Sequence, residues 1–333
     1  MNLFTDATER KRPQEVLGLD FCTTGVKAVR LKLQNDQVHL VAADIFPGGA
    51  DELVRPEIGK IFASNYVALA ISAPTCVVRI VAHAASPGSK DVDRQVREQI
   101  GLDAGYRLMS VPSGQAAKGK NENRVLAVGV PEKDALGVLK LFRDGPPAPC
   151  SLEVSGLASL NAALLGPMAA NADAPMCLLD CGSRVSMMVF MNKGAIVLAR
   201  KLDVGGDAVM EGVQKNLGVD REMAASIMSE GAIDISQSVR EVIDPFLRQM
   251  MISRDFVERQ ENCHVTTALI TGGMSMSAYW SDEIRKSTGM AVQNWDPMEG
   301  MMVDADAIPG RLESQRSRFA AAIGAARGVL TEP

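Results

Sequence analysis

The sequence is poor in the residues that hold metals or bind nucleic acid. Only three histidines occur among 333 residues, no CxxC motif is present, and the six cysteines are scattered. Most of these cysteines lie in apolar, strand-like runs, so we expect reduced and buried thiols, as in a cytoplasmic protein, rather than a disulfide framework or a structural zinc site. Lys and Arg number 35 against 40 Asp and Glu, without a basic run, which argues against nucleic acid as a partner.

Long apolar segments are missing as well. Residues 1–15 are mostly polar and carry charges of both signs, so they lack the apolar region of a signal peptide, and we expect a flexible N-terminus. No run approaches the roughly 18 apolar residues that a membrane-spanning helix needs. The sequence therefore predicts no direct membrane insertion and any recruitment to a membrane through a partner. With 47% hydrophobic residues the chain can bury a large core, and its length suggests about two domains.

Two segments share one pattern of strands and turns. In the first, strands are predicted over 16–21, 27–33 and 38–45, and Asp20 closes the first of them. The second segment begins near residue 176 and ends near residue 202, and Asp180 takes the place of Asp20. Because β-meanders are common and Asp favours turns, the pattern alone leaves duplication and coincidence equally open.

The remaining chain is mostly helical, with one segment that reads as an insert. Residues 86–149 contain a charged helix and a polar loop and end in the breaker Gly-Pro-Pro-Ala-Pro, which predicts an inserted subdomain. The predicted division is a first domain over 16–85 and 151–174, the insert over 86–150, a second domain over 175–310, and a last helix over 311–330. Predicted helices cover 90–100, 131–142, 205–217, 221–230, 239–261 and 312–330, with a polar loop over 112–123 and strands over 124–130 and 267–270.

Both Asp turns have the composition of a phosphate and magnesium site. A carboxylate at the end of a buried strand can organise Mg²⁺ through its water shell, while turn N–H groups and hydroxyls receive phosphate oxygens. Paired glycines near a helix start would let the backbone approach a flat ring or a ribose. The residues concerned are Asp20, Cys22, Thr23, Thr24 and Lys27 in the first turn, Asp180, Gly182 and Ser183 in the second, and the pairs Gly205-Gly206 and Gly272-Gly273. Lys27 would add a positive charge unless strand alternation sends it to solvent.

The order of these features resembles the actin, heat-shock chaperone and sugar-kinase superfold. Within it, the chain is similar to the PilM-like proteins of type IV pilus assembly, which are relatives of the division protein FtsA. The likeness rests on the segments GLDFCTTGVKAVRL, LLDCGSRVSMMVF, GGDAVMEGVQKNLGVDREMAASI and LITGGMSMSAYW. It implies an α/β fold of two RNase H-like domains with an inserted small α+β subdomain and a last helix that packs back on the first domain.

The resemblance also implies ligands and partners. ATP and Mg²⁺ would lie between the domains, with Asp20 and Asp180 holding the metal through water, and Gly206, Lys215, Gly272 and Gly273 contacting adenosine. The insert and the first domain would bind the cytoplasmic N-terminal peptide of a PilN-like single-pass membrane protein, and a pilus motor ATPase is a further implied partner. The protein would then be cytoplasmic, at the inner face of the cytoplasmic membrane.

Two departures from the family pattern keep three functions open. Cys22 stands where many relatives have a small Gly or Ser, and its sulfur crowds the approach of the phosphates. The adenosine turn continues as Met274-Ser275-Met276, which narrows the ring site. The chain is then a nucleotide-binding scaffold, a degenerate member without nucleotide, or an enzyme. An enzyme would be at most a slow ATPase, or a small-molecule kinase, with Glu153 as the catalytic candidate.

Overall fold

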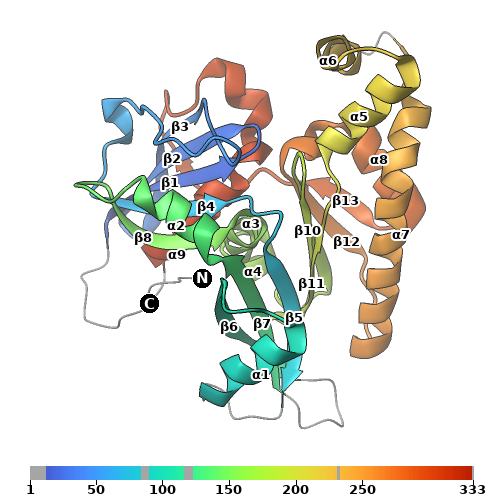
Figure 1. The fold of residues 1–333 in the computed structure, drawn as a ribbon, viewed down its shortest axis with the longest axis horizontal. Helices are drawn as coiled ribbons and strands as arrows, with labels where there is room; N and C mark the ends of the chain where they lie inside the picture. The colour runs from blue at the N-terminus through green and yellow to red at the C-terminus, as the bar shows by residue number, and fades with distance from the viewer. Residues whose placement is uncertain (1–12, 84–89, 116–122, 231–232, 332–333) are drawn as a thin grey trace.

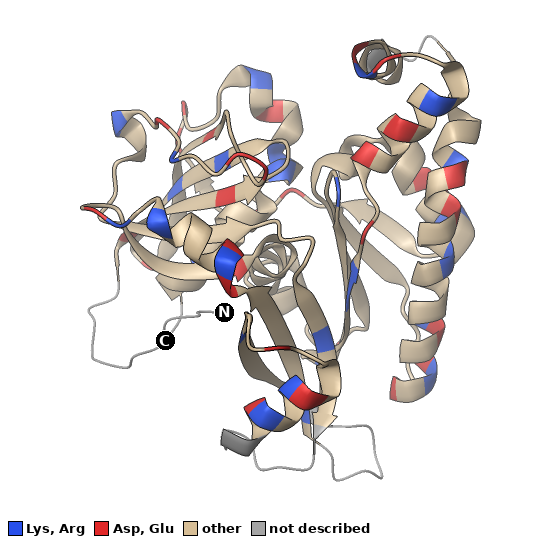
Figure 2. Cartoon of the chain, viewed as in Figure 1, with Lys and Arg blue, Asp and Glu red and all other residues tan. Residues whose placement is uncertain are grey.

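Two mixed sheets lie on either side of a pair of helices, and a third sheet lies below them in the view of Figure 1. The computed structural model describes residues 13–83, 90–115, 123–230 and 233–331. The predicted flexible N-terminus lies outside the described residues except for residues 13–15, of which Glu15 already belongs to the first strand. Basic and acidic residues are interspersed along the helices in Figure 2.

The first sheet has the strand order β14-β3-β2-β1-β4-β8. Strands β1 to β3 are antiparallel, whereas β4 and β8 run parallel to β1. The turn between β2 and β3 has positive φ at both Asn35 and Asp36, the conformation of a tight hairpin turn. The strands are β1 (Glu15–Cys22), β2 (Gly25–Gln34), β3 (Gln37–Phe46), β4 (Tyr66–Ile71), β8 (Ala148–Val154) and β14 (Met302–Val303), and a short 3₁₀ turn, η1 (Lys60–Phe62), precedes β4.

The second sheet repeats the first. Its strand order is β11-β10-β9-β12-β13, and the corresponding strands of the first sheet are β3-β2-β1-β4-β8. Both sheets have three antiparallel strands followed by two parallel ones. The strand orders therefore decide for the duplication that the sequence pattern left open, and the predicted superfold is confirmed. The strands are β9 (Met176–Cys181), β10 (Ser186–Asn192), β11 (Ala195–Leu202), β12 (Thr267–Thr271) and β13 (Ala291–Asn294).

Side-chain alternation gives the second sheet two buried faces. Leu178 and Val189 join the core shared with the first sheet, whereas their neighbours Cys177 and Phe190 join a second core on the opposite face. A period of two sends successive side chains to opposite faces, so one strand serves both cores. Helices α3 (Ser155–Leu164) and α9 (Ala320–Thr331) fill the space between the sheets, and α5 (Gly206–Leu217), α7 (Ser236–Glu261) and α8 (Ala278–Thr288) cover the outer face. The other elements of this part of the chain are α4 (Pro167–Ala170), α6 (Arg221–Glu230) and η2 (Gly273–Met276).

The predicted last helix, 312–330, is wrong in its first half. Residues Gly310–Phe319 form a 3₁₀ segment, η3, with non-helical angles at Gln315, and only the part from Ala320 is α-helical. The carbonyl of Ser317 accepts hydrogen bonds from the Gly272 N–H at 3.1 Å and from Thr271 Oγ1 at 3.0 Å. Because this carbonyl bonds the second domain, it does not accept the intrahelical hydrogen bond that an α-helix needs at this position. The α-helix therefore begins after Ser317.

The third sheet, β5-β7-β6, forms an insert between β4 and β8. Strand β5 pairs with β7, so this sheet begins at Val77, ahead of the division predicted at residue 86. The predicted polar loop over 112–123 is partly strand, because β6 continues to Gln115 and accommodates Pro112 at an irregularity in its pairing with β7. The rest of that loop lies outside the described residues. The elements are β5 (Val77–His83), α1 (Lys90–Ile100), β6 (Tyr106–Gln115), β7 (Asn123–Pro131) and α2 (Glu132–Lys140).

The insert also contacts the second domain. Arg124 of β7 forms an ion pair with Glu261, at the end of α7, with 2.7 Å between Nη1 and Oε1. The side chains are only 5% and 12% exposed, so this pair is largely shielded from solvent. Lys201 of β11 donates to the carbonyl of Pro74 in the loop that leads into the insert. The insert is therefore linked to both domains.

None of the helices in the described part of the chain has the length and hydropathy needed to span a bilayer.

Candidate functional site

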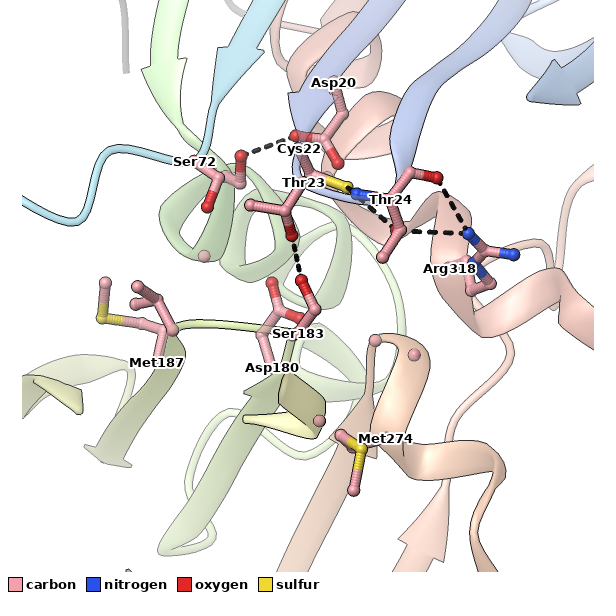
Figure 3. A pocket seen from close by; sticks show the side chains of 18 of the residues that line it. Asp20, Cys22, Thr23, Thr24, Ser72, Asp180, Ser183, Met187, Met274 and Arg318 are labelled. Atoms are coloured by element: carbon pink, nitrogen blue, oxygen red, sulfur yellow. Dashed lines mark hydrogen bonds between the residues drawn. The ribbon is translucent and has the colours of Figure 1, made fainter. Parts of the chain in front are cut away.

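A cavity of about 450 Å³ lies where the two Asp turns face each other (Figure 3). It is bordered by the ends of β1 and β9, the start of α3, the start of α5, and the turn after β12. The structure brings most of the predicted site residues to this one cavity. They are Asp20, Cys22, Thr23, Thr24, Lys27, Asp180, Gly182, Ser183, Gly206, Gly272 and Gly273.

Helix α3 holds both carboxylates. Ser155 Oγ donates to Asp20 Oδ1 at 2.6 Å, and Ser159 Oγ donates to Asp180 Oδ2 at 2.7 Å. The two serines are four residues apart and therefore lie one above the other on the same helix face. One rigid helix thus sets the position of both Asp side chains, each of which keeps a second carboxylate oxygen for another partner.

Burial raises the pKa of both carboxyl groups. The pKa of Asp20 lies above its ordinary value because the group is buried, and the charge of Lys27 and the hydrogen bond from Ser155 oppose that shift. Burial raises the pKa of Asp180 from 3.8 to about 6, the hydrogen bond from Ser159 opposes the shift, and the charge of Asp20 adds to it. Two carboxylates that face one cavity and resist ionisation favour a cation that neutralises them.

A pH dependence follows from the raised pKa of Asp180. A metal ion binds the carboxylate and not the acid, so we expect Mg·ATP to raise the melting temperature more at pH 7.5 than at pH 5, with the change centred near pH 6. Differential scanning fluorimetry across this range measures it. Asp180→Asn serves as the control, because a variant without this carboxylate should show no Mg·ATP shift at either pH. An equal Mg·ATP shift at both pH values in the unsubstituted protein would contradict the prediction.

The first turn is bonded within itself. Lys27 is 3% exposed and donates to Thr24 Oγ1 at 2.8 Å and to Cys22 Sγ. Lys27 therefore points into the site and not to solvent. The sulfur of Cys22 occupies part of the space beside the ammonium group, as expected for a Cβ and sulfur in this turn. Thr23 Oγ1 and Ser183 Oγ are hydrogen-bonded to each other, so the two turns meet across the cavity (Figure 3).

A second cation reaches the first turn from the far end of the chain. Arg318 Nη2 donates to the Thr24 carbonyl at 3.3 Å and to Thr24 Oγ1 at 3.2 Å, and the residue lines the cavity (Figure 3). Burial lowers the pKa of this guanidinium, which still remains charged at neutral pH. Lys27 and Arg318 thus supply positive charge on the side of the cavity where phosphate groups would lie.

The glycine turns allow close approach of the backbone. Gly272 has φ of +86°, and a Cβ there would lie 2.6 Å from Asp180 Oδ1 and from the carbonyl oxygen of Cys181. A Cβ at Gly205 would lie 2.4 Å from the carbonyl oxygen of Gly182. Only glycine fits at these two positions, because the turn after β12 and the start of α5 both press on the second Asp turn.

Two predicted residues lie elsewhere. Glu153 is buried on β8 and accepts a hydrogen bond from Asn161 Nδ2 at 2.7 Å, while its neighbour Val154 lines the cavity. Alternation along β8 turns Glu153 away from the site, which argues against the predicted catalytic role. Lys215 is exposed in the last turn of α5 and does not line the cavity. Nine residues of helix, about 14 Å, separate it from Gly206.

Several lining residues were missed by sequence analysis. Ser155 and Ser159 were detectable, since two serines four apart at a helix start after a strand can share a face. Arg318 was not detectable, because it reaches the site only through the return of the C-terminal segment. Arg184 of the second Asp turn is not a lining residue, but it pairs with Asp51 at 2.5 Å and with Asp207 at 3.4 Å and so links the two domains beside the cavity.

The donor set fits a magnesium nucleotide. In the described residues, no group of three or more His, Cys, Asp or Glu side chains gathers as a metal cage. Mg²⁺ is usually held by one or two carboxylates, water and substrate phosphates, which the pair of Asp20 and Asp180 can provide. The hydroxyls of Thr23 and Ser183 and the ammonium of Lys27 are suited to phosphate oxygens. The arrangement can therefore hold a polyphosphate with a cation between two domains.

One solved structure supports this fold, and two weaker matches accompany it. The solved structure of a PilM-PilN type IV pilus biogenesis complex matches with a TM-score of 0.78 and 19% identity over 97% of this chain and all of that chain. Ethanolamine utilization protein EutJ from Carboxydothermus hydrogenoformans matches with a TM-score of 0.47 and 14% identity over 97% and 91%. Ta0583, an archaeal actin homologue solved with ADP, matches with a TM-score of 0.44 and 12% identity over 94% and 98%. A search of curated proteins by sequence finds no significant match.

A family model covers most of the two central helices and the whole of the second domain. It is described as type IV pilus assembly protein PilM, and it matches residues 158–328, from α3 to α9. The matched segment includes the second Asp turn, both glycine turns and Arg318, and it spans more than half of the chain. The chain therefore belongs to the PilM family of type IV pilus assembly proteins.

Proposed function

We propose that this protein is a cytoplasmic scaffold of a type IV pilus assembly that binds Mg·ATP in the cavity and a PilN-like peptide at its insert. One observation carries the nucleotide part: two facing carboxylates, Asp20 and Asp180, are held by two serines of one helix. A cation and a polyphosphate at that point would contact both domains. Nucleotide occupancy would therefore affect how the domains are held together.

The roles of the residues follow from their positions. Asp20 and Asp180 would hold Mg²⁺ through its water shell, and the metal would neutralise their charge and that of the phosphates. Lys27 and the hydroxyls of Thr23 and Ser183 would receive phosphate oxygens. The Thr23–Ser183 contact must then open, and Cys22 must yield space beside Lys27, so we expect modest affinity.

The cavity favours binding over turnover. Its acidic lining residues are the two metal-side carboxylates and Asp207, which is engaged by Arg184 and Arg221. A general base must be free to reach a water or a hydroxyl in line with the phosphate. Among the described lining residues none is in that state, which supports a switch or a structural nucleotide and at most slow hydrolysis.

The partner proposal rests on the family and on the insert. The chain that matches with a TM-score of 0.78 was solved in a complex with PilN. We propose that the cytoplasmic N-terminal peptide of a PilN-like single-pass protein binds between the first domain and the insert. The protein would thereby be recruited to the inner face of the cytoplasmic membrane, where a pilus motor ATPase would be a further partner. Through the ion pair between Arg124 and Glu261, a movement of the insert would be transmitted to the second domain.

Two binding measurements test this function separately. Saturating Mg·ATP should raise the melting temperature, because a ligand that binds only the folded state stabilises it by roughly 2.7 kcal/mol at a hundred times its Kd. No rise with Mg·ATP would mean that the cavity has lost nucleotide. A labelled peptide from the N-terminus of the PilN-like protein of the same organism, compared with a scrambled peptide by fluorescence anisotropy, tests the partner. Equal anisotropy for both peptides, with and without Mg·ATP, would remove the scaffold proposal.

A further inference from the structure

We infer that the end of the cavity away from the two Asp residues binds a nucleobase through methionine thioethers and accepts adenine and guanine alike. This inference rests on the proposed nucleotide function and specifies the ligand class of the same cavity. Four of the five methionines that line the cavity lie on three elements: Met210 on α5, Met228 on α6, and Met274 and Met276 on η2. The fifth, Met187 on β10, is part of the first core. The polar end of the cavity suits phosphates, so the flat and less polar part of a nucleotide belongs at this end.

Core packing does not account for all four side chains. Met228 and Met274 pack against the second hydrophobic core, but Met210 and Met276 belong to neither of the two large cores, and Met276 is 49% exposed. The Met274 side chain lies over the start of α5, where a Cβ on Gly206 would be 2.9 Å from its Sδ. The four thioethers therefore form an adaptable surface between α5 and η2, and filling the core does not explain all of them.

The polar side chains nearby are engaged with the protein. Ser275 Oγ donates to the carbonyl of Gly272 at 2.7 Å, and Ser317 Oγ donates to the same carbonyl at 3.3 Å. Asp207 accepts from Arg221 at 2.8 Å and from Arg184 at 3.4 Å. The guanidinium of Arg221 is exposed, and it can stack on either purine.

The consequence is that this site discriminates only weakly between adenine and guanine nucleotides. Adenine and guanine differ at position 6 and at the 2-amino group, and a protein distinguishes them by hydrogen bonds to those positions. A site built on such hydrogen bonds rejects the wrong ligand strongly, whereas apolar contact separates ligands of similar size only slightly. Thioethers contact the faces of both purines equally well.

Isothermal titration with Mg·ATP, Mg·GTP and Mg·tripolyphosphate tests the inference on the full chain. We expect the Kd values for ATP and GTP to agree within about fivefold. Met210→Ala, which touches neither large core, should weaken both nucleotides by about three- to tenfold and leave tripolyphosphate unchanged. Met302→Ala, an exposed methionine on β14 outside the cavity, is the matched control and should change nothing.

The outcomes separate this inference from the function beneath it. ATP binding more than about twentyfold tighter than GTP would overturn the inference and leave the proposed nucleotide function standing. Unchanged nucleotide affinity in Met210→Ala would overturn the methionine site in the same way. Absence of binding by either nucleotide would overturn both the inference and the proposed function.

Discussion

Asp180→Asn is expected to abolish the rise in melting temperature that Mg·ATP produces, while making the protein without ligand more stable at neutral pH. The amide keeps the hydrogen bond from Ser159 Oγ but carries no charge for the metal. Without Mg²⁺, the triphosphate would face the Asp20 carboxylate with no cation between them. We expect the Mg·ATP shift of this variant to fall to the level given by Mg²⁺ alone, as measured by differential scanning fluorimetry.

The stability gain has the opposite sign and follows from the raised pKa. Because the pKa of Asp180 rises from 3.8 in the unfolded chain to about 6 in the folded protein, the folded state holds the proton more tightly. Stability is therefore lost as pH rises from about 4 to about 6, by roughly 3 kcal/mol as an upper value. The Asn side chain does not ionise, so the variant does not lose this stability as pH rises. Urea unfolding at pH 7.5 should therefore show that the variant is the more stable protein.

The matched control is Asp173→Asn, an exposed residue in the loop before β9. It changes charge equally and should leave both the Mg·ATP shift and the pH dependence of stability as they are. A full Mg·ATP shift in Asp180→Asn would show that the second Asp turn does not hold the metal. Reduced stability of the variant at pH 7.5 would show that the carboxylate is stabilising in the free protein.

The strand ends that carry the two Asp residues were predictable because their signals are local. Each follows an apolar run of strand length and precedes a turn, so the position of the carboxylate at the end of β1 or β9 needs no information from elsewhere. The cavity that joins them needs the order of the sheets and the place of α3. The shared strand and turn pattern of the two units left this duplication open, and only the strand orders could decide it.

The errors came from contacts that a local pattern does not contain. Glu153 was an attractive acid near a domain junction, yet alternation on β8 gives Val154 and not Glu153 to the cavity. The end of the chain was predicted as one helix, but the Ser317 carbonyl accepts hydrogen bonds from the second domain. Arg318 enters the site because of that same break. Local sequence therefore predicted the turns, and packing between distant segments decided which side chains surround them.

The two central helices pack without room for a methyl group, which gives the largest stability prediction. A Cβ on Gly324 of α9 would lie 1.7 Å from the carbonyl oxygen of Ala158 on α3. Backbone, not a flexible side chain, occupies that space. The helices could separate only by pushing the two sheets apart, because both lie between them.

Gly324→Ala should therefore destabilise the protein by about 3 kcal/mol, the upper end of what overpacking of a tight core typically costs. Helix propensity alone predicts the reverse, a gain of about 1 kcal/mol for Ala over Gly inside a helix. Gly310→Ala is the control, because apart from its own and adjacent residues no atom lies within 4 Å of its added Cβ, and it should be nearly neutral in the same urea titration. Since α3 also carries Ser155 and Ser159, displacing it should reduce the Mg·ATP shift of the Gly324 variant. A variant as stable as the starting protein would mean that α3 and α9 are not in this close contact. It would also contradict the position of α3 from which Ser155 and Ser159 hold the two Asp side chains.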